Sequence, residues 1–273
     1  MTFPKSIAVT SGKGGVGKTN ISVNLSIALQ KLGERVVLFD ADLALANSHI
    51  VLGSQPERTI VDAISADLPL SDLVTEGPLG LKLIAGGSGL SELMGLSDEM
   101  RKKIIGSFSG LTSVTDRLIV DTAAGVETNV TEYVEACDRV IVVVVGEPSA
   151  FIDAYASIKV LHQDTGRKHF DVIINRVRDD AHGKDIFNRF KTIADQFLKA
   201  ELHHIGSVPE DSLLLQAVSR CQPLVLAFPN APAARAITKI ATMLHSDNPT
   251  PTDDAKTGFF HQQPAPELQD FAP

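Results

Sequence analysis

The feature that most constrains this chain is the glycine-rich segment GKGGVGKT at residues 12–19. It follows the apolar run Ile7–Thr10 and precedes apolar residues at helical spacing, so we predict that it joins a strand to a helix. The segment fits the phosphate-loop pattern G-x-x-x-x-G-K-[ST]. Its glycines allow backbone angles that other residues avoid and let N–H groups close around phosphate oxygens. Lys18 would place a cation on the terminal phosphates, and the Thr19 hydroxyl would bind Mg²⁺ at a helix N-terminus that favours anions.

Such a short pattern can also arise in an ordinary glycine turn. The strand before it and the helix after it, which Gly33 ends, favour the phosphate-loop interpretation. A second lysine, Lys13, lies inside the loop, where the general pattern does not require it. Its spacing alone predicts a solvated loop residue.

Composition narrows the class of protein. At 273 residues the chain is long enough for one large α/β domain or two small ones. It has no Trp, so the core is expected to consist of Val, Ile, Leu and Ala, as in a buried parallel sheet. The net charge of −8 argues against non-specific binding to DNA. The longest apolar run, Val140–Val145, is too short to span a bilayer.

Cysteine and histidine give little sign of metal chemistry. Cys137 and Cys221 are far apart, in no metal-ligand spacing, as expected for reduced thiols of a cytoplasmic protein. We expect the eight histidines to form no cluster. We expect His203 and His204, which lead a predicted strand, to pack or cap rather than bind metal.

Strand-like and helix-like segments alternate along the chain. This alternation predicts an α/β fold with a doubly wound, mainly parallel sheet flanked by helices, the P-loop NTPase fold. The predicted strands are Ser6–Thr10, Arg35–Phe39, Leu81–Ile84, Arg117–Val120, Arg139–Val145, Asp171–Ile174 and His204–Val208. The predicted helices are Thr19–Leu32, Asp98–Phe108, Ile152–Leu161, Asp185–Leu198 and Pro232–Leu244.

Carboxylates follow two of these strands. Asp40 and Asp42 end the strand that follows the loop helix, and Asp121 ends the Walker-B-like run LIVD at residues 118–121. Ligands of open α/β sheets bind at the carboxyl ends of strands, so these groups are expected beside the phosphate loop. We assign Asp40 and Asp121 to Mg²⁺ and Asp42 to the attacking water. Each aspartate alone could equally be a helix cap or turn residue.

Two later segments could form a base pocket. Asn175 and Arg176 follow a strand, and the amide of Asn175 can both donate and accept at a purine edge. A turn asparagine fits the same position equally well. Pro209, Glu210 and Asp211 close a later strand and could complete the pocket through backbone contacts.

These motifs together resemble those of the MinD/ParA ATPases, which carry a deviant Walker A loop. The likeness covers roughly residues 5–245. The loop continuation ISVNL (residues 21–25), the switch-like segment DADLALAN (40–47) and the second, VDTAAG (120–125), are most similar to the flagellar-number branch called FlhG or FleN. Lys13 matches the extra lysine that, in this family, reaches the nucleotide of the partner subunit.

The resemblance implies an ATP- and Mg²⁺-dependent ATPase that forms a homodimer when ATP is bound. It also implies protein partners in flagellar assembly or polar positioning, and control of flagellar placement or number. The protein is expected in the cytoplasm, or peripherally at the inner membrane or cell pole. The set of residues proposed to hold nucleotide comprises Gly12, Lys13, Gly14, Gly15, Val16, Gly17, Lys18, Thr19, Asn20, Asn175, Arg176, Pro209, Glu210 and Asp211.

The resemblance also sets expectations for the two ends of the chain. Many flagellar members carry an N-terminal extension that activates a GTPase, and only a few residues precede the first strand here. We predict an ATPase domain over residues 1–245 and a flexible, acidic, Pro-rich tail over 246–273. Pro264 and Pro266 interrupt any amphipathic helix in that tail, so membrane contact is expected to be weak or to need a partner. Phe259 and Phe260 are either incidental aromatics or a short docking or membrane-touching element.

Three other functions share the same loop. A ParA-type partitioning ATPase would bind DNA through surface Lys and Arg, which the acidic balance disfavours. Metal-delivery members of the superfamily need paired cysteines, which this chain lacks. A division-site MinD remains an alternative to the flagellar role.

Overall fold

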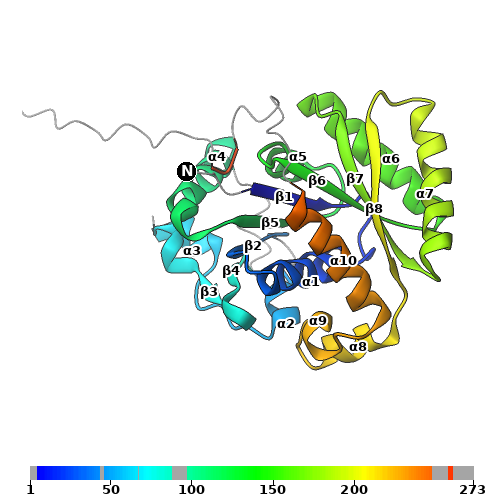
Figure 1. Ribbon diagram of the computed structural model, residues 1–273. Helices are drawn as coiled ribbons and strands as arrows, with labels where there is room; N and C mark the ends of the chain where they lie inside the picture. The colour runs from blue at the N-terminus through cyan, green and yellow to red at the C-terminus, as the bar shows by residue number, and fades with distance from the viewer. Residues whose placement is uncertain (1–4, 44–45, 67, 88–96, 248–257, 261–273) are drawn as a thin grey trace, which may run out of the picture.

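The protein is built around one eight-stranded sheet, in the order β3-β4-β2-β5-β1-β6-β7-β8 (Figure 1). This computed structural model describes residues 5–43, 46–66, 68–87, 97–247 and 258–260. All neighbouring strands are parallel except β3, which runs antiparallel to β4 at one edge. The strands are β1 Lys5–Thr10, β2 Val36–Ala41, β3 Thr75–Glu76, β4 Lys82–Ile84, β5 Arg117–Thr122, β6 Arg139–Val145, β7 His169–Val177 and β8 Glu201–Pro209.

Helices cover both faces of the sheet, as the alternating sequence pattern predicted (Figure 1). Each face has its own apolar core. One face is covered by α1 Lys18–Lys31, α2 Ser48–Leu52, α8 Ser212–Ser219, α9 Leu224–Ala227 and α10 Pro232–Ser246. The other is covered by α3 Ile60–Ala66, α4 Asp98–Ser107, α5 Thr128–Glu135, α6 Pro148–Thr165 and α7 Asp180–Asp195, together with the 3₁₀ turns Leu70–Leu73 and Phe108–Val114.

The strands are apolar on both faces because each face packs on helices. Along β6, Val140, Val142 and Val144 enter one core, whereas Ile141 and Val143 enter the other. A strand buried on both sides reads as a continuous Val/Ile run rather than an alternating one. The predicted fold class is therefore confirmed, and β6 has the predicted bounds.

The short elements were not predicted. The two-residue strand β3 and the helices α2, α3, α5, α8 and α9 escaped the sequence analysis, since they span too few residues to show a period. Two predicted helices begin too late, because α6 starts at Pro148 and α7 at Asp180. Pro148 at the first turn and the Asp179 side chain, which caps α7, are the start signals that were missed.

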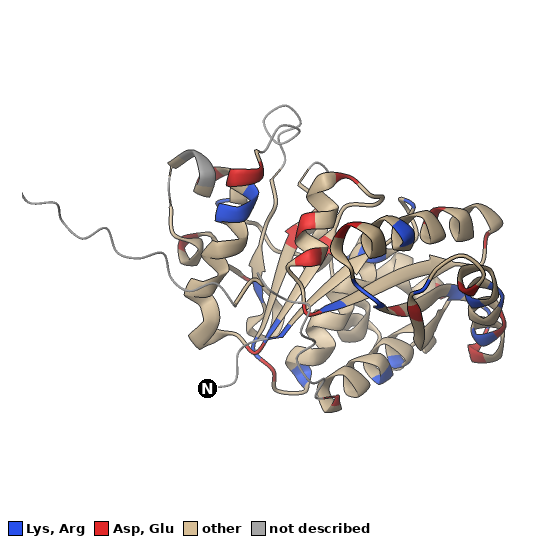
Figure 2. Ribbon diagram, turned by 90° about the horizontal axis from the view of Figure 1, so that it is seen from above, with Lys and Arg blue, Asp and Glu red and all other residues tan. Residues whose placement is uncertain are grey.

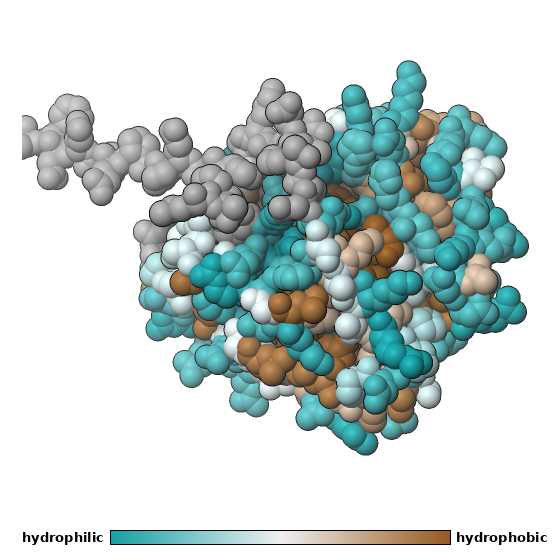
Figure 3. All heavy atoms as spheres, viewed as in Figure 1, coloured by the Kyte–Doolittle hydropathy of each residue, from teal (hydrophilic) through white to brown (hydrophobic). Residues whose placement is uncertain are grey.

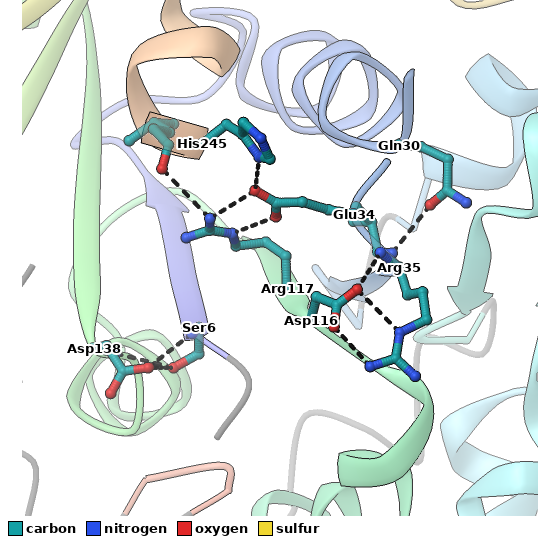
Figure 4. Close-up of polar contacts among 10 residues, drawn as sticks. Ser6, Gln30, Glu34, Arg35, Asp116, Arg117, Asp138 and His245 are labelled. Carbon is teal, nitrogen blue, oxygen red and sulfur yellow. Dashed lines mark hydrogen bonds and ion pairs between the residues drawn. The ribbon is translucent and has the colours of Figure 1, made fainter. Parts of the chain in front are cut away.

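A polar network joins the amino ends of the central strands (Figure 4). Arg117 at the start of β5 makes two hydrogen bonds to Glu34, at 2.8 and 2.9 Å, and both side chains are buried. His245, near the end of α10, lies 2.8 Å from Glu34. In a separate contact at the same end of the sheet, Asp138 accepts hydrogen bonds from Ser6 near the start of β1. The contacts of Glu34 with Arg117 and His245 therefore join α10 to the amino ends of the strands, at the end of the sheet opposite the glycine-rich loop.

Phe259 and Phe260 are buried against the domain, so they are docked rather than incidental. The ring of Phe259 packs edge-on to Phe108 at 4.9 Å, and its backbone N–H donates to the Ala136 carbonyl at 3.3 Å. The rest of the predicted tail after Asp247 lies outside the described residues. The division into domain and flexible tail stays a prediction.

The described surface is mixed in polarity. From above, Lys and Arg are spread over several helices and alternate with Asp and Glu (Figure 2). On the face in Figure 3, apolar side chains gather over α1, α2, α8 and α9, where the partly buried Leu213, Leu226 and Phe228 extend that core toward the surface. None of the helices described here is long and apolar enough to cross a membrane.

Candidate functional site

The glycine-rich loop connects β1 to α1 and adopts a conformation that needs glycine. Gly15 and Gly17 have φ values of 76° and 97°, in the left-handed region that side chains disfavour. A Cβ on Gly17 would lie 2.5 Å from Nδ2 of Asn175, and one on Gly12 would lie 2.1 Å from the backbone of Asp153 in α6. The loop is therefore held between α6 and the end of β7.

Lys18 lies at the N-terminus of α1 with its side chain largely buried. Burial lowers the pKa of this ammonium group, while the negative charges of Asp121 and Asp42 oppose the change. A buried cation whose neighbours are carboxylates of adjacent strands is well placed for anionic groups that enter the loop.

Asp40 and Asp121 lie side by side at the ends of β2 and β5, in direct register. Both are buried, and desolvation raises the pKa of Asp40 to about 7 and that of Asp121 to about 6, with their mutual repulsion adding to the shift in Asp40. Two buried carboxylates this close favour a shared proton or a bound cation. A bound divalent cation would favour ionisation of both carboxylates.

Hydroxyl groups surround this carboxylate pair. Ser22 of α1 donates to Asp121 at 2.9 Å, and the nearby Thr19 hydroxyl lowers the pKa of Asp121 in the same way. Ser48, at the start of α2, donates its backbone N–H to Asp40 at 2.8 Å, and its hydroxyl lies 3.4 Å from Asp121. Sequence reasoning missed Ser22 and Ser48. Ser22 lies one helical turn after Thr19, and that spacing is the signal that could have found it.

Asp42 lies just beyond β2, partly exposed, where its backbone N–H donates to Asp40 at 3.3 Å. Its charge acts on both Lys18 and Asp121. The structure thus brings the predicted group of Lys18, Thr19, Asp40, Asp42 and Asp121 to one place.

Lys13 points elsewhere. Its Nζ lies 3.1 Å from Glu147 and 3.3 Å from the Ser149 hydroxyl, at the start of α6. Both members of this ion pair are substantially exposed, so the contact is weak and easily exchanged for another anion.

The loop after β5 is fastened to the glycine-rich loop. The Gly125 N–H donates to the Ser11 carbonyl at 2.9 Å, and the Gly125 carbonyl accepts from Ser157 of α6 at 3.1 Å. Gly125 has a φ of 97°, and residues with a side chain rarely adopt this left-handed conformation. Ser157 was a further residue that sequence reasoning missed, and nothing in its spacing pointed to it.

Asn175 and Arg176 contact the loop backbone. The Asn175 amide donates to the Val16 carbonyl at 2.8 Å, and Arg176 donates to the Gly15 carbonyl at 2.7 Å. Arg176 has a positive φ of 56°, a strained angle that recurs at functional sites. In this conformation the Asn175 donor is engaged by the loop, so its predicted pairing with a base is not tested.

The segment after β8 serves as a helix cap. The Asp211 carboxylate accepts from the backbone N–H groups of Leu213 at 3.0 Å and of Ala233 at 3.2 Å. The Glu210 N–H donates to the Val177 carbonyl at 2.8 Å. Pro209 ends β8 beside Val177, so the segment lies next to the end of β7, as the predicted base pocket requires.

The residues present fit a phosphate–magnesium group. Mg²⁺ prefers oxygen ligands, and the Thr19 hydroxyl with the two buried carboxylates supplies them. On either side of the loop, the buried Thr10 Oγ1 and Asn20 Oδ1 have no hydrogen-bond partner among the described residues. Buried polar atoms without partners are uncommon, which indicates that a ligand or water completes the site.

The doubly wound sheet, the loop and the carboxylates define a P-loop nucleotide-binding protein. The family model described as the CobQ/CobB/MinD/ParA nucleotide binding domain matches residues 7–224. The chain therefore belongs to this family, which confirms the resemblance found in its sequence motifs.

Several proteins of this family with known names are similar to this chain over most of its length. The antiactivator FleN of Pseudomonas aeruginosa is 40% identical over 240 residues, which cover 88% of this chain and 86% of that protein. The flagellum site-determining protein YlxH of Helicobacter pylori is 35% identical over 243 residues, covering 89% and 82%. Among solved structures, the MinC:MinD cell division complex of Aquifex aeolicus has a TM-score of 0.72 at 29% identity, covering 90% and 98%.

Proposed function

We propose that this protein is a Mg²⁺-dependent ATPase switch that dimerises with ATP and controls the placement or number of flagella. The observation that carries the proposal is the buried pair Asp40 and Asp121 beside Lys18 and the loop backbone. Two carboxylates with raised pKa values and a lysine with a lowered one gather where phosphates would enter. Ionisable groups with strongly shifted pKa values that lie together are typical of functional sites.

Each residue has a role in this proposal. The loop amides and Lys18 hold the phosphates, and Lys13 exchanges Glu147 for the partner subunit's nucleotide. Thr19, Asp40 and Asp121 hold Mg²⁺, either directly or through water. The metal would neutralise charge on the terminal phosphates. Asp42 orients the attacking water, so catalysis consists of positioning and charge stabilisation without a covalent intermediate.

The loop that contains Gly125 would carry the nucleotide state to the surface. It bonds both to the glycine-rich loop through Ser11 and to α6 through Ser157. A terminal phosphate that displaces these bonds would shift α6 and so change the surface that a partner contacts.

The flagellar role rests on the relatives. FleN is described as an antiactivator and YlxH as a flagellum site-determining protein, and the alignment with both covers more than four-fifths of this chain. Partners would be proteins of flagellar assembly or polar positioning. The protein would act in the cytoplasm, at the inner membrane or at the cell pole, with weak or partner-dependent membrane contact.

The test compares two variants with wild-type protein by ATPase assay and sedimentation. Asp42→Ala should retain ATP, lose roughly 100-fold or more in turnover, and accumulate as dimer, because water is no longer oriented. Lys18→Ala should bind no nucleotide and stay monomeric. Normal hydrolysis by Asp42→Ala would remove its assignment, and unchanged ATP affinity of Lys18→Ala by calorimetry would contradict the phosphate site.

A genetic test separates the biological roles. Deletion of the gene in the source bacterium should change the number or position of flagella while septa form at their usual place. Misplaced septa with normal flagella would instead support the division-site role, which the Aquifex MinD structure represents.

A further inference from the structure

Three exposed side chains on β7 and β8 lie together at the end of the sheet opposite the glycine-rich loop. His169 is the first residue of β7, and Glu201 is its register partner at the start of β8. His203 lies two residues farther along β8, so its side chain points to the same face as that of Glu201. The expectation that the histidines form no cluster is therefore wrong, since strand pairing joins residues that are far apart in the sequence.

The ligand atoms converge on one point. Oε2 of Glu201 lies 3.2 Å from Nδ1 of His169 and 3.8 Å from Nε2 of His203. All three candidate ligand atoms lie within 4.8 Å of one another. In a tetrahedral site with bonds of about 2.1 Å, ligand atoms are about 3.4 Å apart, so small side-chain rotations would complete the geometry.

An ordinary ion pair joins one imidazole to a carboxylate, whereas here two imidazoles lie close to the same Glu201 oxygen. The imidazole rings lie 6.1 Å apart and nearly parallel, with an angle of 26° between their planes. The register partner of His203 is Asp171, which is buried and held by Arg139. Because Asp171 is already paired with Arg139, the remaining candidate ligands are the two imidazoles and Glu201.

We propose that His169, Glu201 and His203 form a binding site for a borderline divalent transition-metal ion, with Zn²⁺ as the representative. Imidazole ligands select Zn²⁺, Ni²⁺ or Cu²⁺ over the hard ion Mg²⁺, which prefers oxygen. Water would supply the fourth ligand, because all three residues are exposed. The ion would cross-link the edge strand β8 to β7.

This site is independent of the nucleotide site. β7 runs from His169, at the amino end of the strand, to Asn175 beside the glycine-rich loop, and these residues are about 20 Å apart along the strand. Mg²⁺ can therefore occupy the carboxylate pair while Zn²⁺ is titrated into the His–Glu–His site.

The test is Zn²⁺ calorimetry on full-length, tag-free protein in buffer with excess Mg²⁺. Wild-type protein should bind one Zn²⁺ per chain at this site and gain thermal stability in proportion to Zn²⁺. His169→Ala and His203→Ala should each weaken Zn²⁺ binding at least about tenfold, and Glu201→Gln should weaken it similarly. His182→Ala, on α7, is the matched histidine control and should bind as wild type does.

Cobalt(II) provides a second readout that does not depend on stability. Its visible absorption should show imidazole-ligated Co²⁺ in wild type and in His182→Ala, and lose that signal in His169→Ala. Equal Zn²⁺ affinity in all variants would overturn the proposal. So would half an ion per chain with Zn²⁺-dependent dimerisation, since the site would then need two copies of the chain.

Discussion

At the scale of single residues, the buried pair Asp40 and Asp121, which we assign to Mg²⁺ binding, lowers the stability of the metal-free fold at neutral pH. Asp121 is buried beside Asp40, and desolvation raises the pKa of both groups. A carboxylate with a folded-state pKa above its unfolded value destabilises the fold as pH rises through that interval. The metal-free domain is therefore strained at neutral pH by the groups that we assign to Mg²⁺.

The first prediction concerns Asp121→Asn. The amide keeps the shape and can still pair with the Ser22 and Ser48 hydroxyls, but it carries no charge. Without metal and nucleotide, the melting temperature at pH 7.5 should rise by on the order of 5 °C, whereas ATP hydrolysis should be lost. Scanning calorimetry from pH 4 to 8 should show the difference growing between about pH 4 and pH 6.

Asp164→Asn, an exposed change on α6, is the control and should leave the melting temperature unchanged. A lower melting temperature for Asp121→Asn would contradict the strain argument.

The second prediction compares two glycines of the same loop. A Cβ on Gly12 would overlap the backbone of Asp153, which cannot rotate away, whereas one on Gly14 would meet no atom within 4 Å. Gly12→Ala should destabilise the protein by about 1–3 kcal/mol, as overpacking does. The free energy of unfolding of Gly14→Ala should lie within about 0.5 kcal/mol of that of the wild type. Urea unfolding measures both, and equal stabilities would refute the tight approach of α6 to the loop.

At the scale of elements, the amino-end network fastens α10 to the sheet. Burial opposes ionisation of Glu34, but hydrogen bonds and charge from Arg117 and His245 outweigh burial and lower the Glu34 pKa. Stability from a carboxyl with a lowered pKa is present above its unfolded value and is lost as pH falls through the folded value. Ionised Glu34 thus stabilises the fold at neutral pH and stops doing so in acid.

The third prediction is that Glu34→Gln costs on the order of 3 kcal/mol at pH 7, because it leaves Arg117 buried without its counter-charge. The deficit relative to wild type should shrink as pH falls below about 4.5. Denaturant melts at several pH values measure it. Asp116→Asn, in the exposed pair with Arg35 shown in Figure 4, should cost less than about 1 kcal/mol. Equal losses for the two variants would show that burial does not decide the effect.

At the scale of the whole molecule, the distribution of charge bears on whether this protein binds DNA. The chain has net charge −8, and the Lys and Arg residues of the described surface are dispersed among acids in the view of Figure 2. DNA binding of the partitioning type depends on neutralising several phosphates at once. The described surface offers no concentrated strip of positive charge in that view.

The fourth prediction follows. With a non-cleavable ATP analogue and Mg²⁺, the protein should sediment as a dimer and should not shift duplex DNA in a gel at low salt. Without nucleotide it should sediment as a monomer. A lone protomer under saturating analogue would end the switch proposal, and a DNA shift that salt abolishes would favour a partitioning role.

The amino-acid sequence was enough to predict every strand of the sheet except β3, together with the glycine-rich loop and the carboxylates. The strands β1, β2, β5 and β6 each contain a continuous apolar run, and the residues at their carboxyl ends form a local pattern that needs no knowledge of distant contacts. For the same reason Lys18, Asp40 and Asp121 could be predicted to meet, since parallel strands bring their carboxyl ends to one edge.

Contacts between segments far apart in the chain became visible only in the folded structure. The docking of Phe259 on Phe108, the contact of the Asn175 amide with the loop and the approach of the Ser48 hydroxyl to Asp121 leave no periodic trace in the sequence. The same holds for His169 and His203, which become neighbours because β7 pairs with β8. Strand register is set by the packing of the entire core rather than by the residues it brings together, so a single sequence does not reveal such sites.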